Sequence, residues 1–296
     1  MSTRKAAVAG RFYPGDPTAL TELAEKLLTA VAPPADERLA AGYVVPHAGY
    51  RFSGPIAAQV YARLRQHAGA VRRVVLVGPS HFVPLRGCAV PTVDRWATPL
   101  GELAVASELR ATLLAAATRP ATEPGAGAEP EAGAEPGVTS GQGAGAGLGV
   151  VADDAPHQRE HSLEVQLPFL IQALGNDVEV LPIAVGAAPA ADVAAVIETA
   201  LAAGGEGTVL ICSTDFSHYH DHATAQRLDR RTAEAVTALR PDQIGVRDAC
   251  GVFALRGTVA WARDRALTPD LLDLRTSADT QGDPERVVGY PAFALR

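Results

Sequence analysis

The chain has 296 residues, of which 47% are hydrophobic and 20% are charged, and its formal net charge at pH 7 is -7. This composition suits a globular protein that buries a full hydrophobic core. Lys and Arg form no cluster that would bind nucleic acid, and no apolar run approaches the roughly 18 residues of a membrane span. The N-terminal stretch MSTRKAAVAGRFYPG has no signal-peptide core, so we expect a cytoplasmic location. The three cysteines are widely spaced, so we expect no disulfide framework.

Before residue 118 the chain alternates short Val-rich runs with amphipathic segments. Ser53 is the expected N-cap of the first predicted helix, in which Ile56, Val60 and Leu64 share one face. The elements predicted here are a strand at 42–46, a helix at 54–66, strands at 73–77 and 88–93, and a helix at 106–117.

Residues 118–149 interrupt this pattern with repeated Gly, Ala, Pro and Glu. Such a composition does not form a packed core. We predict a disordered surface insertion within one domain, because candidate site residues lie on both sides of it. A linker between two independent domains is the alternative.

The alternation of strand and helix resumes after this segment. The elements predicted here are a helix at 160–174, a strand at 178–185, a helix at 190–203, a strand at 207–213, helices at 222–239 and 252–264, and a last strand in RVVGYPAFALR. Regular alternation predicts an α/β fold, a single domain with a mostly parallel central sheet flanked by helices.

Three histidines directly follow predicted buried strands. His47 follows YVVP, His81 ends VVLVGPSH, and His218 follows VLICSTDFS. Ligands of open α/β sheets bind outside the carboxyl ends of the strands, so we expect three imidazoles at one edge of the sheet. For His47 taken alone, an exposed or capping residue is the alternative.

His47 and His81 are candidate metal ligands. Neutral imidazole is the commonest protein ligand for zinc, iron and copper. The stretch between the two histidines has room for one helix, so we expect their strands to be neighbours joined by a right-handed crossover. Two adjacent strand ends would then form two corners of a metal site.

The segment STDFSHYHDH is the densest polar cluster of the chain. Asp215 and His218 lie in the turn after a predicted strand, and we expect the carboxylate to orient the imidazole. Asp221, further along, is an expected helix N-cap.

His161 and Glu164 lie in EHSLEVQLPFL, at the start of the predicted helix 160–174. These two positions share a helical face, so we expect the pair to point into a cleft and take part in catalysis. A capping arrangement is the alternative for Glu164.

Cys250 lies in RDACGVFAL, just before the predicted helix 252–264. A buried structural cysteine is one interpretation. The other is a metal ligand or nucleophile whose thiol pKa is lowered by the helix N-terminus.

Several stretches together resemble the Memo family, also called AmmeMemoRadiSam system protein B. They occur in the family's order over nearly the whole chain, apart from residues 118–149. The matching stretches are GRFYPGDP, PHAGYRFSG, GPSH, TPLGEL, EHSLEVQLPF, STDFSHY, ACG and GYPAFAL.

The resemblance implies a fold similar to class III extradiol ring-cleaving dioxygenases, which hold non-haem iron(II) with two histidines and a carboxylate. His47 and His81 match the two histidine ligands, and His218 matches a further, acid–base histidine. Cys250 lies where Memo-like proteins have a cysteine as third ligand, which departs from the dioxygenase pattern. A thiolate softens the site and favours iron or copper with redox chemistry, or a metal site without turnover.

We therefore expect a metal-binding, dioxygenase-like protein that uses iron(II) or copper and acts on a small aromatic or other molecule. The alternative is a non-catalytic adaptor whose vestigial active-site cleft binds a peptide or small ligand, since human relatives are described as signalling effectors. Metal-assisted hydrolysis or thiol redox chemistry through Cys250 is a third possibility. We expect no nucleic-acid or membrane partner.

Overall fold

The computed structural model describes residues 1–118 and 148–296. Residues 119–147, which make up most of the predicted insertion, lie outside the described residues. Strands from both sides of this segment join one sheet, because β4 (Cys88–Val90) pairs with β7 (Val150–Ala152) and with β8 (Glu179–Val185).

Parallel strands form the centre of this sheet. The order of the four central strands is β8, β3 (Arg73–Pro79), β9 (Thr208–Ser213) and β2 (Gly42–Val45), and each runs parallel to its neighbours. Their residues are almost all buried and apolar, as expected for a sheet that is covered on both faces. The predicted α/β fold with a mostly parallel central sheet is confirmed.

The outer strands complete the sheet on both sides. β12 (Val287–Leu295) runs antiparallel to β2, β10 (His218–His220) and β11 (Pro269–Thr276). At the other margin lie β6 (Gly101–Val105), β5 (Arg95–Thr98) and β1 (Thr3–Arg4).

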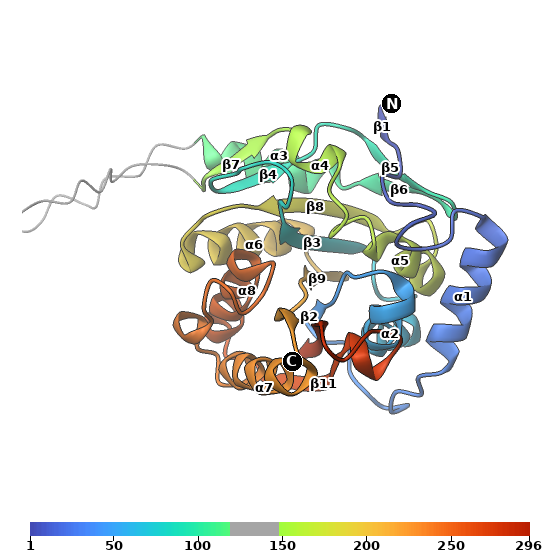
Figure 1. The fold of residues 1–296 in the computed structure, drawn as a ribbon. Coiled ribbons are helices and arrows are strands. Elements are labelled where there is room, and N and C mark those ends of the chain that lie inside the picture. Colours follow the sequence, from blue (N-terminus) through green and yellow to red (C-terminus); the bar gives the residue numbers. More distant parts are fainter. Residues whose placement is uncertain (119–147) are drawn as a thin grey trace, which may run out of the picture.

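Helices cover the two faces of the sheet (Figure 1). On one face α1 (Pro17–Thr29), α2 (Tyr50–Gln66) and α5 (Gln166–Leu174) pack together. On the other, α6 (Ala190–Gly204) packs against α8 (Val252–Asp264) and α3 (Ser107–Ala117). The remaining α-helices are α7 (His222–Thr237), which packs on β11, and the short α4 (Ala155–Gln158). No helix within residues 1–118 and 148–296 is long and apolar enough to cross a membrane.

Two helix starts differ from the predictions. Helix α2 begins at Tyr50, with Gly49 as N-cap, and Ser53 donates its hydroxyl to the Ala48 carbonyl from inside the helix. The predicted N-cap role of Ser53 is therefore wrong. The predicted helix 160–174 is also shorter, because α5 begins only at Gln166.

The strand order corrects a further prediction. β9 lies between β2 and β3, so the strands that precede His47 and His81 are not neighbours. A single helix can connect two strands that are neighbours or two strands that have another strand between them, so the spacing in sequence does not decide between these arrangements. The register places Val45 beside Ser213 and Val77 beside Cys212, so the three strands end at one edge and their polar ends converge there.

Candidate metal centre

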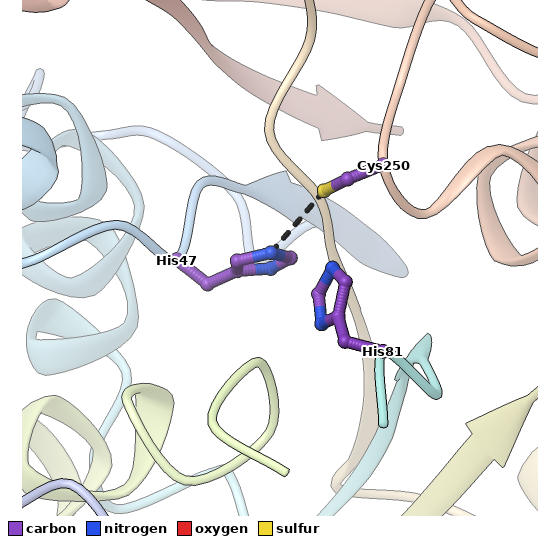
Figure 2. A group of neighbouring side chains, drawn as sticks. All are labelled: His47, His81 and Cys250. Carbon is purple, nitrogen blue, oxygen red and sulfur yellow. Dashed lines mark hydrogen bonds between the residues drawn. The ribbon is translucent and has the colours of Figure 1, made fainter. Parts of the chain in front are cut away.

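The three predicted metal ligands lie together at the carboxyl edge of the sheet. His47 follows β2, His81 follows β3, and Cys250 precedes α8. Their ligand atoms all lie within 4.8 Å of one another, and Nε2 of His47 is 3.2 Å from Sγ of Cys250. Figure 2 shows the two rings and the sulfur pointing into a common space. The structure thus assembles the predicted ligand set from three distant parts of the sequence.

His47 is buried and held from two sides. Its main-chain N–H donates to Oδ1 of Asp215 at 2.7 Å, and its ring Nδ1 lies 3.0 Å from Oγ of Ser213. Burial, and then the neighbouring His161 and His81, lower the pKa of His47 well below its ordinary value. The ring is therefore neutral at neutral pH, as a metal ligand requires.

His81 is held by Glu160, a residue that we did not predict. Oε2 of Glu160 accepts the main-chain N–H of His81 at 2.6 Å, and Oε1 lies 2.9 Å from the ring Nδ1. Burial alone would raise the pKa of Glu160, but hydrogen bonds from His81 and from the N–H of Ser162 outweigh it and lower this pKa to about 2. The ionised carboxylate keeps the proton on Nδ1 and leaves Nε2 of His81 free for a metal.

His81, Glu160 and His161 also lie close enough together to suggest a second ion site. The oxygens of Glu160, however, already accept the ring and main-chain N–H groups of His81 and the main-chain N–H groups of His161 and Ser162. An ion at this position would displace those hydrogen bonds, so Glu160 acts as an orienting group.

His161, which we predicted as a catalytic residue, lies within the cluster. Its ring stacks on His81 with the centroids 4.7 Å apart, and it lies edge-on to His47 at 5.4 Å. Burial lowers the pKa of His161 to about 4, against the opposing effect of Glu160. His161 is not helical as predicted, because the carboxylate of Glu160 binds the N–H groups of His161 and Ser162 in a turn.

Cys250 is a free thiol whose pKa is raised, although it lies beside the start of a helix. Helix α8 begins at Val252, with Gly251 as N-cap. Burial and the carboxylate of Asp215 raise the pKa of Cys250 above its ordinary value. The predicted lowering of this pKa by the helix is therefore wrong, because desolvation outweighs the helix dipole. A protonated thiol at neutral pH argues against an activated nucleophile.

Asp215 and His218 also border the site, but not as a hydrogen-bonded pair. Asp215 accepts the N–H of His47, whereas Nδ1 of His218 donates to the carbonyl of Phe216 at 2.8 Å. The prediction that Asp215 orients His218 is thus wrong, since a main-chain carbonyl does so. Burial raises the pKa of Asp215 to about 7 and lowers the pKa of His218. Next to His218, Tyr219 has a φ of 65°, a left-handed conformation that side chains rarely adopt.

The structure does not bring Glu164 into the cluster. Its carboxylate pairs with Arg4 at 2.7 Å and accepts the hydroxyl of Tyr13 at 2.6 Å. It also accepts the main-chain N–H groups of Ala7 and Val8 at 2.7 and 2.9 Å. Glu164 therefore anchors the N-terminal segment, which is neither of the two roles considered for it.

Ser213, Gln166 and Tyr61 complete the surroundings of His47. Gln166 donates through Nε2 to the carbonyl of Pro46 at 3.0 Å and to Oγ of Ser213 at 2.8 Å, and it accepts the hydroxyl of Tyr61 at 2.7 Å. These residues were missed in the sequence because they sit inside apolar runs. The sequence signal that could have identified them is a polar residue inside a predicted buried strand or helix, because such a residue needs a hydrogen-bond partner.

Comparison with known proteins agrees with this geometry. The family model for Memo-like protein matches residues 4–131 and 144–294, and its interruption falls inside the predicted insertion. A MEMO1 family protein of Methanopyrus kandleri is 33% identical over 313 residues, which cover 99% of both chains. Another, from Desulfurococcus amylolyticus, is 31% identical over 310 residues, again covering 99% of both. The chain therefore belongs to the Memo-like protein family.

Proposed function

We propose that the protein binds a redox-active metal, iron(II) or copper, through His47, His81 and Cys250. The convergence of these side chains at one sheet edge carries the proposal. Two imidazoles and one sulfur within 4.8 Å of one another form a donor set that fits such an ion. Imidazole suits iron and copper, and thiolate favours the softer copper(I).

When bound, the metal would supply Lewis-acid or electron-transfer chemistry, and a dioxygenase-like reaction on a small aromatic molecule is our leading proposal. The roles of the neighbouring side chains follow from their protonation. His161 and His218 have lowered pKa values, so both are neutral imidazoles beside the ligands at neutral pH. Each can accept a proton from a substrate held at the site and return it later.

A cavity beside the cluster supports a small-molecule ligand. It has a volume of about 420 Å³ and is lined by Phe12, Tyr50 and Phe52, among others. The ring of Phe12 lies 4.7 Å from that of His161, which connects the cavity wall to the cluster. Volume and aromatic lining suit a small organic molecule. The charged side chains that line it are Arg11 and Arg51, so an acidic group on the ligand would be favoured.

Metal analysis of the protein purified without chelators tests the proposed site. We expect iron or copper in the wild type and its loss in the His47→Ala/His81→Ala variant. The matched control is His67→Ala/His222→Ala, which removes two histidines bonded elsewhere, to Glu37 and Thr276. Equal metal contents in the wild type and the His47→Ala/His81→Ala variant would sink the assignment.

The second candidate is a non-catalytic adaptor that binds a peptide or small ligand. The cavity favours it in one respect, because its lining residues lie outside the ligand set and could bind a partner without metal. Oxygen uptake by iron-loaded protein over a panel of catechols separates the two functions. Uptake supports the enzyme, whereas no uptake together with ligand binding that survives chelation supports the adaptor.

A further inference from the structure

We infer that Tyr61, Gln166 and Ser213 form a hydrogen-bond relay that fixes His47 as the Nδ1–H tautomer and thereby presents an unprotonated Nε2 to the metal site. The tautomer is a property of the metal-free chain. Its consequence for metal affinity rests on the proposed function.

The relay starts at the side-chain amide of Gln166, whose orientation is set at both ends. The carbonyl of Pro46 only accepts hydrogen bonds, so the amide atom 3.0 Å from it must be the NH₂ group. The hydroxyl of Tyr61 donates to the opposite end, Oε1, at 2.7 Å. The second N–H of the amide then points at Oγ of Ser213, 2.8 Å away.

Ser213 passes this constraint to His47, because its hydroxyl has one proton and three neighbours. Gln166 donates to Oγ, so it cannot take the proton. The carbonyl of Ser162, 2.7 Å away, can only accept and takes it. The third neighbour is Nδ1 of His47 at 3.0 Å, and it can interact favourably with Oγ only by donating.

The opposite tautomer of His47 would leave this group of atoms unsatisfied. The Ser213 proton would have to turn to Nδ1, and the carbonyl of Ser162 would then face an oxygen lone pair at 2.7 Å. His47 is 1% exposed, and Ser213, Gln166 and Tyr61 are each 0% exposed, so water does not replace the lost bond. Burial thus makes the hydrogen-bond pattern decisive.

The consequence appears at the other ring nitrogen. With the proton on Nδ1, Nε2 carries a lone pair directed toward the space shared with Cys250, whose Sγ is 3.2 Å away. In the metal-free chain this nitrogen can accept the thiol proton of Cys250. Tyr61, Gln166 and Ser213 are thus positioning residues, which act on a metal through His47.

Nitrogen-15 NMR of the histidine-labelled, metal-free protein tests the tautomer directly, with the His47 signals identified by their absence in His47→Gln. We expect protonated Nδ1 and unprotonated Nε2. The reverse assignment would overturn the inference even if the protein binds metal. If the wild type binds no metal, the proposed function fails while this measurement still decides the tautomer.

Two tyrosine variants test the relay without placing a change at the site. Tyr61 and Tyr43 are both buried, but the hydroxyl of Tyr43 accepts the main-chain N–H of Ala40. We expect Tyr61→Phe, in which only the carbonyl of Pro46 orients Gln166, to lower the share of the Nδ1–H tautomer of His47 and to weaken metal binding. We expect Tyr43→Phe to retain the wild-type tautomer and affinity.

Ser213→Ala removes the direct partner of Nδ1 and should lower metal affinity by about 10–100-fold. Its control is Thr232→Val, which removes a buried hydroxyl that donates to the carbonyl of Leu228 within its own helix. A single wild-type tautomer in Tyr61→Phe and in Ser213→Ala would overturn the relay. If Ser213→Ala does not fold, the wild-type spectrum and the tyrosine pair still decide the question.

Discussion

Nε2 of His47 lies 3.2 Å from Sγ of Cys250, although 203 residues separate the two in sequence. Main-chain packing brings them together. Gly251 permits the approach, because a Cβ there would lie 2.9 Å from Oγ1 of Thr214 and 3.1 Å from Pro79. The imidazole and the thiol are therefore held in place before any metal arrives, which lowers the entropic cost of binding one.

Cobalt(II) provides a spectroscopic test of Cys250 as a ligand. A thiolate bound to cobalt(II) absorbs in the near ultraviolet by charge transfer, so we expect this band in the wild type and its loss in Cys250→Ser. Cys88→Ser is the matched control, since Cys88 is buried in β4 and is not part of the candidate ligand groups. A band of equal intensity in Cys250→Ser would remove the cysteine from the ligand set.

The thiol of Cys250 should be unreactive toward alkylating reagents in the metal-free protein. Burial and Asp215 raise its pKa, so less thiolate is present at neutral pH than in a free cysteine. Alkylation at pH 7.5, followed by mass spectrometry in a Cys88→Ser/Cys212→Ser background, should be slower in the native than in the unfolded chain. Faster native alkylation would revive the activated-nucleophile hypothesis.

The candidate metal ligands could be predicted from the sequence better than the residues that hold them in place. His47 and His81 were predictable because short buried strands direct the next residues to one edge of a parallel sheet. Cys250 followed from resemblance, since its position before α8 equally suits a structural cysteine. Glu160 and Ser213 were not predictable, because their roles depend on contacts between segments far apart in sequence.

The fold, too, was predictable only in part. The parallel strands and long helices follow from Val-rich runs and helical periodicity, and most of them lie within a few residues of the predicted bounds. The placement of β9 between β2 and β3 did not follow, because sequence spacing constrains which connections are possible and leaves strand order open. The start of α5 was missed because a side chain, Glu160, competes for the main-chain N–H groups before it.

Glu164→Gln should destabilise the protein substantially. The change removes the charge that pairs with Arg4, whose side chain is 6% exposed, and leaves a buried cation without its carboxylate. The free energy of unfolding should fall by about 3–5 kcal/mol, as measured by urea denaturation. Glu179→Gln, which breaks a partly exposed pair with Arg73, should cost no more than about 1 kcal/mol. Similar losses in the two variants would contradict the anchoring role of Glu164.

His157 should make the fold sensitive to mild acid. It is buried and donates through Nε2 to the carbonyl of Ala89 at 3.1 Å. Burial lowers its pKa from 6.5 to about 4, so below pH 6.5 the unfolded chain binds a proton that the native ring does not. Stability is therefore fully present above pH 6.5 and is lost as the pH falls toward 4.

The variant His157→Gln retains an N–H donor but does not titrate. Between pH 7 and pH 4 it should lose roughly 3 kcal/mol less stability than the wild type, which urea unfolding at several pH values measures. His161 also has a pKa lowered to about 4, so the variant should reduce the acid sensitivity without abolishing it. The same pH dependence in His157→Gln and the wild type would rule out this role.

Glu160→Gln should weaken metal binding in the folded fraction of the protein. The substitution removes the negative charge that accepts Nδ1–H of His81 at 2.9 Å, so the ring loses both its orientation and part of its basicity. We expect metal affinity to fall by about 10–100-fold in titrations that follow the cobalt(II) band.

Glu164→Gln is an informative control, because this second buried glutamate belongs to the same segment but contacts Arg4 and Tyr13 instead of the histidines. The folded fraction of Glu164→Gln should keep wild-type affinity despite its lower stability. If both variants lost affinity equally, a general loosening of the segment would explain the effect, and the specific role of Glu160 at His81 would be wrong.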